Sequence, residues 1–153
     1  MTTDQPMPAV TLRPVAEADL EALYAIQADP AWAEIVGLPG RGHEDYLEHK
    51  ARILADPANL TRAIEADGAV VGSIATFPMG DAREVGYSVA REHWGRGIAT
   101  EALSLMLAED PTRPLRAEVA LHNAGSRRVL EKLGFVQVDV DESEGLAILV
   151  LDA

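Results

Sequence analysis

Apolar residues recur at helical spacing in two stretches of the first third of the chain. The first stretch predicts a helix over residues 17–28, from Leu20, Leu23, Tyr24 and Ile26. The second predicts a helix over residues 43–55, from Leu47, Ala51 and Leu54. An Asp-Pro pair follows each stretch and is expected to end the helix there, because the residue before proline disfavours helical geometry. Residues 31–42 show no clear period and are predicted to be a loop with one helical turn at most.

Alternating apolar and polar residues predict strands through the rest of the chain, with two further helices among them. The Asp67-Gly68 pair, flanked by strand-like runs at 61–66 and 69–77, is a strong hairpin signal. Other strands are predicted at 10–15, 82–89, 115–121, 135–140 and 146–151, and helices at 97–109 and 124–133. This order predicts an α+β fold with a mixed, mostly antiparallel central sheet flanked by helices on both faces.

Composition narrows the classes of function. The chain has 153 residues, so one domain is expected, and it has no cysteine. Its net charge of −12 argues against a nucleic-acid partner, because phosphate contacts require clustered Lys and Arg. The acidic surface fits an amine-bearing partner only loosely, since such surfaces mostly serve solubility. No secretory signal or apolar run of ~20 residues is seen, so a cytoplasmic protein without membrane contact is expected.

No metal site is predicted. The four histidines are scattered along the chain. The run Asp139-x-Asp141-x-Ser143 resembles the start of a calcium loop, but Glu144 and Val150 occupy the positions of the required Gly and Glu. The acidic turn 139–144 is therefore interpreted as a solvated hairpin, with contact to a cationic acceptor as the alternative.

A glycine-bearing turn, Trp94-Gly95-Arg96-Gly97, lies between the predicted strand 82–89 and the helix that follows. Such a turn leaves backbone N–H groups unpaired at a helix N-terminus, where the helix dipole also favours negative charge. Glycines let an anion approach the backbone closely. The spacing matches neither the P-loop nor the dinucleotide fingerprint, so the residues themselves predict an anion site of unspecified kind or a plain tight turn.

Three blocks resemble the GNAT superfamily of N-acetyltransferases, and within it the ribosomal-protein N-terminal (Rim-type) branch. Residues Trp94–Ala99 resemble the acetyl-CoA loop Gln/Arg-x-x-Gly-x-Gly/Ala, with Trp94 in place of Gln or Arg. Residues Asn123–Phe135 resemble the branch's Asn-x-x-Ser-x-x-x-Leu-x-Lys-x-Gly-Phe signature, and Leu12-Arg13-Pro14 resembles the family's first strand. The resemblance implies a GNAT-like fold, acetyl-CoA as co-substrate, and a single acetyltransferase domain at 9–153 after a flexible segment at 1–8.

The expected cofactor site combines both motif blocks. The backbone of Gly95–Ala99 and the hydroxyl of Thr100 are assigned to the pyrophosphate, and Arg96 either adds charge or is a solvated loop residue. The resemblance implies that Val89 and Arg91 lie beside the cofactor, that Asn123 holds the pantetheine and that Ser126 lies near the sulfur. Asn123 is also suited to cap its helix. The full predicted set is Val89, Arg91, Trp94, Gly95, Arg96, Gly97, Ile98, Ala99, Thr100, Asn123 and Ser126.

Two residues are candidates for proton transfer. The superfamily's usual tyrosine acid is replaced by Leu130, which leaves Ser126 as the candidate acid, while Val129 and Leu133 are interpreted as core. Glu84 shares a strand face with Gly86 and Ser88 and is the candidate base, with an edge salt bridge as the equal alternative. Glu101 is interpreted as stabilising the start of its helix.

These features predict an acetyl-CoA-dependent N-acetyltransferase that transfers acetyl directly to a primary amine. The alternative is a non-catalytic acyl-CoA-binding or sensing module, which would be disfavoured if Glu84 and Ser126 face one cleft. The acceptor stays open among a protein N-terminus, an amino acid, a polyamine and an antibiotic, and the chain is expected to be a monomer or homodimer. The resemblance places the loop 31–46 over the acceptor site.

Overall fold

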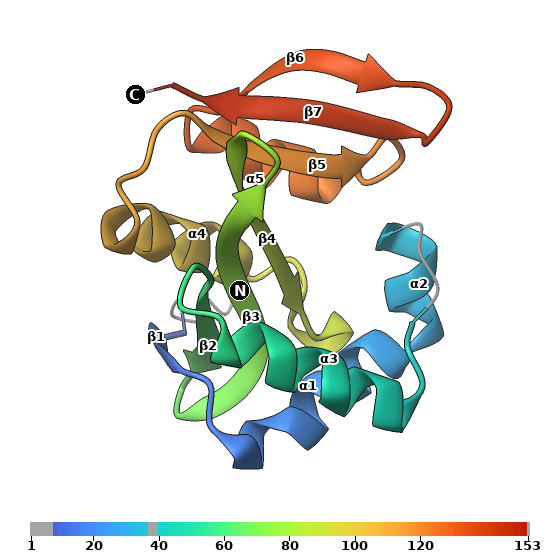
Figure 1. Ribbon diagram of the computed structural model, residues 1–153, viewed down its shortest axis with the longest axis vertical. Helices are drawn as coiled ribbons and strands as arrows, with labels where there is room; N and C mark the ends of the chain where they lie inside the picture. Colours follow the sequence, from blue (N-terminus) through green and yellow to red (C-terminus); the bar gives the residue numbers. More distant parts are fainter. Residues whose placement is uncertain (1–7, 37–39, 153) are drawn as a thin grey trace, which may run out of the picture.

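The computed structural model describes residues 8–36 and 40–152. Its centre is a seven-stranded sheet in the order β1-β2-β3-β4-β5-β7-β6, in which only the β4–β5 pair is parallel (Figure 1). The strands are β1 (Val10–Pro14), β2 (Leu60–Ala66), β3 (Ala69–Met79), β4 (Ala82–Val89), β5 (Leu115–Ala120), β6 (Val136–Asp141) and β7 (Leu146–Leu151). The predicted α+β fold is confirmed. The flexible N-terminus was predicted at 1–8, and seven of these residues, 1–7, lie outside the described residues.

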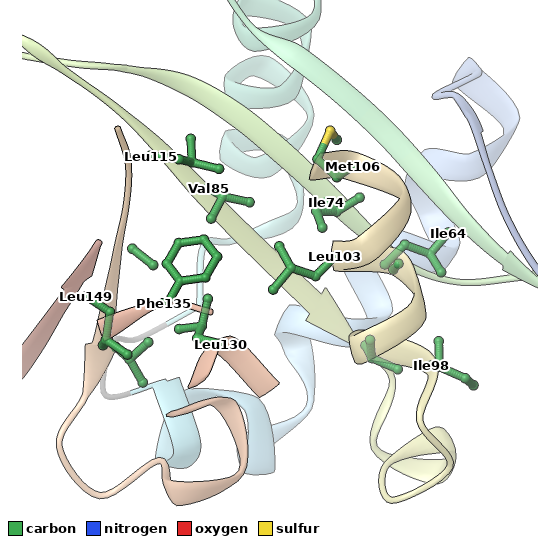
Figure 2. Packing of buried hydrophobic residues seen from close by; sticks show 14 of the residues in the cluster. Ile64, Ile74, Val85, Ile98, Leu103, Met106, Leu115, Leu130, Phe135 and Leu149 are labelled. Carbon is green, nitrogen blue, oxygen red and sulfur yellow. The ribbon is translucent and has the colours of Figure 1, made fainter. Parts of the chain in front are cut away.

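Helices cover both faces of the sheet. They are η1 (Glu17–Asp19), α1 (Leu20–Ala28), α2 (Pro30–Val36), α3 (His43–Ala55), η2 (Arg91–His93), α4 (Ile98–Glu109) and α5 (Ala124–Lys132). On one face, Leu103 and Met106 of α4 pack against Ile74 and Val85 (Figure 2). The same core continues through Leu130, Phe135 and Leu149 under α5, whereas α1 and α3 lie on the opposite face.

Local chemistry explains most of the element boundaries. Asp67 and Gly68 both have positive φ, 51° and 85°, as a two-residue hairpin between right-twisted strands requires. Helix α1 ends at Ala28, as predicted from the Asp-Pro pair that follows. The chain then forms helix α2, of seven residues, where at most one turn was expected. Pro30 is the first residue of α2, where proline is tolerated, and the Asp29 carboxylate accepts a hydrogen bond from the Ala31 N–H at 2.9 Å.

The two parallel strands separate soon after they meet. Pairing between β4 and β5 is limited to Arg83 with Leu115 and Glu84 with Arg116, and the strands then diverge (Figure 1). β4 remains fully paired to β3 on its other side. The last residues of β4 therefore have one unpaired edge, and this edge leads directly into the glycine turn.

Candidate active site

The glycine turn begins helix α4 without a side-chain cap. Gly95 and Gly97 have φ of 77° and 79°, which L-residues with a Cβ rarely adopt. Gly97 is the N-cap of α4, and no side chain accepts the helix's first N–H groups. Trp94 connects the turn to the strand, because its indole N–H donates to the Val89 carbonyl at 2.7 Å. Among the described residues, the N–H groups at the start of α4 thus have no side-chain acceptor, which is the geometry that the glycine turn predicted.

A cavity of about 570 Å³ opens between this turn and helix α5. Nine of the eleven predicted cofactor residues line it: Val89, Trp94, Gly95, Gly97, Ile98, Ala99, Thr100, Asn123 and Ser126. The structure therefore brings the two motif blocks to one cavity. Trp32 and Ile35 of α2 line its other side, and the Trp32 indole donates to the Ser88 hydroxyl at 3.0 Å. The segment expected over the acceptor thus reaches this cavity.

Arg91 and Arg96 are the two predicted residues that do not line the cavity. The Arg91 side chain forms an ion pair with Asp29 at 3.2 Å, and the Arg96 guanidinium lies 3.2 Å from the His93 ring nitrogen. Positive charge at the cavity comes instead from Arg128 and Lys132, one turn apart on α5. The sequence signal for these two was their presence in the second motif block, but no cofactor role was assigned to them.

Two hydroxyl groups, one from α5 and one from β4, meet at the cavity. The Asn123 carboxamide oxygen accepts from the Ser126 N–H at 3.1 Å, so Asn123 caps the helix. The Ser126 hydroxyl lies 2.7 Å from the Tyr87 hydroxyl of β4. Burial raises the pKa of Tyr87, and the hydrogen bond to Ser126 offsets this in part, so the phenol stays protonated at neutral pH. Sequence reasoning missed Tyr87 because it shares a strand face with Val85 and Val89, which belong to the core.

Leu130 and Val129 are neighbours in α5 but have different surroundings. Leu130, at the position of the superfamily's usual tyrosine, is fully buried in the core. Val129, interpreted as core, packs against that core and also lines the cavity. Successive residues of a helix are about 100° apart around its axis, so the two side chains face different directions. Leu130 thus takes no part in the chemistry and anchors the helix.

Glu84 and Ser126 do not line one common cavity, so the condition that would disfavour the non-catalytic alternative is not met. Strand alternation directs Glu84 and Tyr87 to opposite faces of β4. Glu84 is 4% exposed and does not line this cavity, and its Oε1 lies 3.2 Å from Arg116 Nε of β5 without hydrogen-bond geometry. Burial and the neighbouring Glu118 raise the pKa of Glu84, and Arg116 opposes the rise. The ion pair that was the alternative for Glu84 is present.

The acidic turn and two of the histidines have partners within the protein. Asp141 accepts hydrogen bonds from the Ser143 hydroxyl and the Glu144 N–H, so this part of the acidic turn is held by its own residues. His43 lies 2.7 Å from a Glu21 carboxylate oxygen, and His122 lies 2.7 Å from the Glu34 carbonyl. In the residues that the structure describes, no three carboxylate, histidine or cysteine side chains are grouped as metal ligands. Nor is any helix of that part of the chain long and apolar enough to cross a membrane.

Comparisons with known proteins identify relatives of this architecture. A family model described as an acetyltransferase (GNAT) domain matches residues 9–136, whereas no curated protein sequence matches the chain. Among solved structures, RimJ from Mycobacterium smegmatis in complex with CoA-disulfide is 26% identical with a TM-score of 0.80, covering 97% of this chain and 84% of that one.

Two further structures share the fold at lower identity. Spermidine N-acetyltransferase from Vibrio cholerae, in complex with CoA and spermine, is 17% identical with a TM-score of 0.79, and 92% of each chain is covered. An aminoglycoside acetyltransferase in complex with coenzyme A is 22% identical with a TM-score of 0.78, covering 94% of this chain and 95% of that one. At these identities the likeness concerns the fold.

Proposed function

Because the chain belongs to the GNAT acetyltransferase family and is an enzyme that uses acetyl-CoA, we propose that it transfers the acetyl group directly to a primary amine. The observation that carries this proposal is the single cavity joining the uncapped turn of Gly97 to the hydroxyl pair of Ser126 and Tyr87. One end of the cavity suits a pyrophosphate, and the other has a proton donor suited to a leaving thiolate. We further propose that the enzyme domain spans residues 9–153.

The donor is held mainly by backbone groups. The pyrophosphate accepts hydrogen bonds from the N–H groups of residues 95–99, and the Thr100 hydroxyl adds another. Arg128 and Lys132 line the same cavity and neutralise part of the phosphate charge. The pantetheine then extends along the unpaired edge of β4 toward Asn123 and Ser126, because β5 no longer pairs with β4 there.

The reaction needs no covalent enzyme intermediate. The neutral amine attacks the thioester carbonyl, the new C–N bond forms, and the C–S bond breaks as CoA leaves. The Ser126 hydroxyl gives its proton to the departing thiolate, and Tyr87 returns a proton to Ser126 through their 2.7 Å contact. The proton that the nitrogen loses as the amide forms passes through water to Tyr87, so both hydroxyls are restored. Since a thiol has a pKa of about 8.5, the thiolate leaves with modest assistance. The donor pair improves the rate without being indispensable.

The amine proton must also be removed, because amines with a pKa of ~8 to ~10.4 are mostly protonated at neutral pH. Glu84 stays the sequence-based prediction for this role, but its burial beside Arg116 means that it could act only through water. We therefore assign the direct acceptance of the proton to water in the cavity, and assign Glu84 to holding β4 and β5 together at their last paired residues.

We also place the enzyme in the Rim-type branch. This rests on the motif from Asn123 to Phe135 and on the 26% identity to the mycobacterial RimJ. Within that branch both a protein N-terminus and a small-molecule amine satisfy the chemistry described above.

The test of the chemical assignment is a double-mutant cycle at the hydroxyl pair. Ser126→Ala is expected to lower kcat by about tenfold, and Tyr87→Phe by a similar or smaller factor. If the two hydroxyls act in series, the double variant is no slower than the worse single variant. Tyr24→Phe is the matched control, because Tyr24 packs against His43 and Tyr46, outside the cavity. Independent, multiplicative effects of the two substitutions, or no effect of either, would contradict the relay.

A further inference from the structure

A second cavity lies on the other face of the sheet, between α3 and strands β2, β3 and β4. Its volume is about 440 Å³. It shares two lining residues, Tyr87 and Ser88, with the cavity assigned to the donor. The two cavities therefore meet at the end of β4, where the reacting carbonyl is placed in the proposed function.

Small side chains create this second cavity. The register pairs Thr61 of β2 with Ala75 of β3, and Ala75 with Gly86 of β4. Ser73 pairs with Ser88 in the next row of the same face. Because four of these residues have short side chains and Gly86 has none, the sheet leaves a space beneath α3 that larger residues would fill. On the opposite face, the rows that alternate with these carry Ile64, Ile74 and Val85, which belong to the core under α4.

The charge of this cavity is opposite to that of the whole protein. Lys50 of α3 lines it, and the described lining residues include no aspartate or glutamate, although the chain carries a net charge of −12. Lys50 has no ion-pair partner within residues 8–36 and 40–152, and its ammonium lies 5.7 Å from the centre of the Tyr46 ring. Burial lowers the pKa of Lys50, so a bound anion would stabilise its charged form.

A second group in the cavity also lacks a partner. Thr61 is 8% exposed and lines the cavity, and its hydroxyl oxygen has no hydrogen-bond partner in the described structure. Buried polar groups are normally hydrogen-bonded, so an unsatisfied hydroxyl in a cavity wall points to a ligand. One ammonium and one hydroxyl donor together suit a singly charged oxygen anion.

We propose that this second cavity binds a carboxylate of the acceptor through Lys50 and Thr61, so that the acceptor is a small amine that also carries a carboxylate. The inference rests on the proposed function. Thr61 lies two strands from Gly86, the residue next to Tyr87 where the two cavities meet, and this corresponds to roughly 10 Å at ~4.8 Å per strand. The amine and the carboxylate must therefore be separated by several bonds. An ω-amino acid or a short peptide meets this condition, whereas an α-amino acid does not.

Matched acceptors test the proposal. For wild-type enzyme with saturating acetyl-CoA, ε-aminocaproate should have a KM at least about tenfold below that of hexylamine, which has the same chain length without the carboxylate. Glycine should be a poor acceptor. Lys50→Met keeps the side-chain stem and removes the charge, so it should raise the KM for ε-aminocaproate about tenfold while leaving kcat and the KM for hexylamine unchanged. A purely structural role of Lys50 would change both acceptors alike.

Two further variants test the Thr61 hydroxyl and the effect of positive charge elsewhere on α3. Thr61→Val should weaken ε-aminocaproate binding several-fold without lowering Tm, because the hydroxyl it removes has no partner in the protein. Arg52→Met removes the same charge from an exposed position of α3 that does not line the cavity, and it should change neither KM. Equal effects of Arg52→Met and Lys50→Met would mean that only long-range charge is involved, which would overturn the proposal.

Calorimetric titration of ε-aminocaproate into the CoA-bound protein separates this inference from the proposed function. Binding that depends on Lys50, in a protein that acetylates no amine, would support the carboxylate site and contradict the acetyl transfer. Acetylation of amines with no preference within the matched pair, and no Lys50-dependent binding, would refute the carboxylate site and leave the acetyl transfer standing. Both effects together are the expected result.

Discussion

Gly97→Ala separates the anion-binding role of the glycine turn from its backbone requirement. Gly97 has φ 79° and ψ 5° and lines the donor cavity. A residue with a Cβ in this left-handed conformation costs roughly 1–2 kcal/mol, which corresponds to a Tm decrease of roughly 2–8 °C for a domain of this size. The added methyl group also keeps the pyrophosphate away from the N–H groups of α4. Loss of one charge-assisted hydrogen bond, about 1.5–3 kcal/mol, should weaken CoA binding about 10–100-fold.

Gly68→Ala is the matched control for this experiment. Gly68 has φ 85°, and a Cβ there would meet nothing within 4 Å, so the substitution introduces the same kind of strain far from the cavity. Differential scanning calorimetry should show similar Tm decreases for the two variants. Isothermal titration with CoA should show weaker binding only for Gly97→Ala. Unchanged CoA affinity in a folded Gly97→Ala variant, or equal weakening in Gly68→Ala, would refute the assignment of the pyrophosphate to this turn.

Two other substitutions test residues at the edges of the site and in its support. Glu84→Gln should lower turnover by less than about tenfold, because Glu84 lines neither cavity; a fall of ~10²–10⁴-fold with a flattened acidic limb of the pH–rate profile would restore it as the base. Burial acts to raise the pKa of Asp110, but hydrogen bonds from Thr76, Arg83 and Thr112 hold this pKa well below its usual range. The ionised Asp110 carboxylate therefore stabilises the fold above about pH 4, and this stabilisation is lost progressively as the pH falls further. Asp110→Asn should therefore reduce the free energy of unfolding by about 2 kcal/mol at pH 7, and chemical denaturation at decreasing pH should show the difference from wild type shrinking; a constant difference would contradict this.

Local signals in the sequence predicted most of the fold. The Asp67-Gly68 hairpin and the limits of α3 were predictable because turn geometry and helix termination are set by neighbouring residues. Helix α2 was missed because Pro30 was read as the end of one helix, whereas it begins the next, with Asp29 as its cap. A proline can follow the end of one helix or begin the next. Here the second helix is stabilised by contacts such as that of Trp32 with Ser88, which join α2 to the sheet and are not visible in the local sequence.

The parts of the candidate site that lie in continuous sequence motifs were predictable. The parts where side chains from separate helices and strands meet were less predictable. The glycine turn and Asn123–Ser126 were found because each is a continuous block. Tyr87 was missed because its partner, Ser126, is 39 residues away in the chain. The ion pair of Glu84 could not be distinguished from a role as base, because strand alternation identifies which residues share a face but not that Arg116 of the neighbouring strand lies beside Glu84.

The most direct test of the central claim is a combined assay of thiol release and product mass. The purified protein is incubated with acetyl-CoA and a panel of primary amines, free CoA thiol is measured with a chromogenic disulfide, and the amines are analysed by mass spectrometry. Direct transfer predicts that thiol release matches the acetylated amine mole for mole and falls about tenfold in Ser126→Ala, while no acetyl group accumulates on the protein. CoA binding without amine-dependent thiol release, for every amine of the panel, would contradict the account and identify an acyl-CoA-binding module instead.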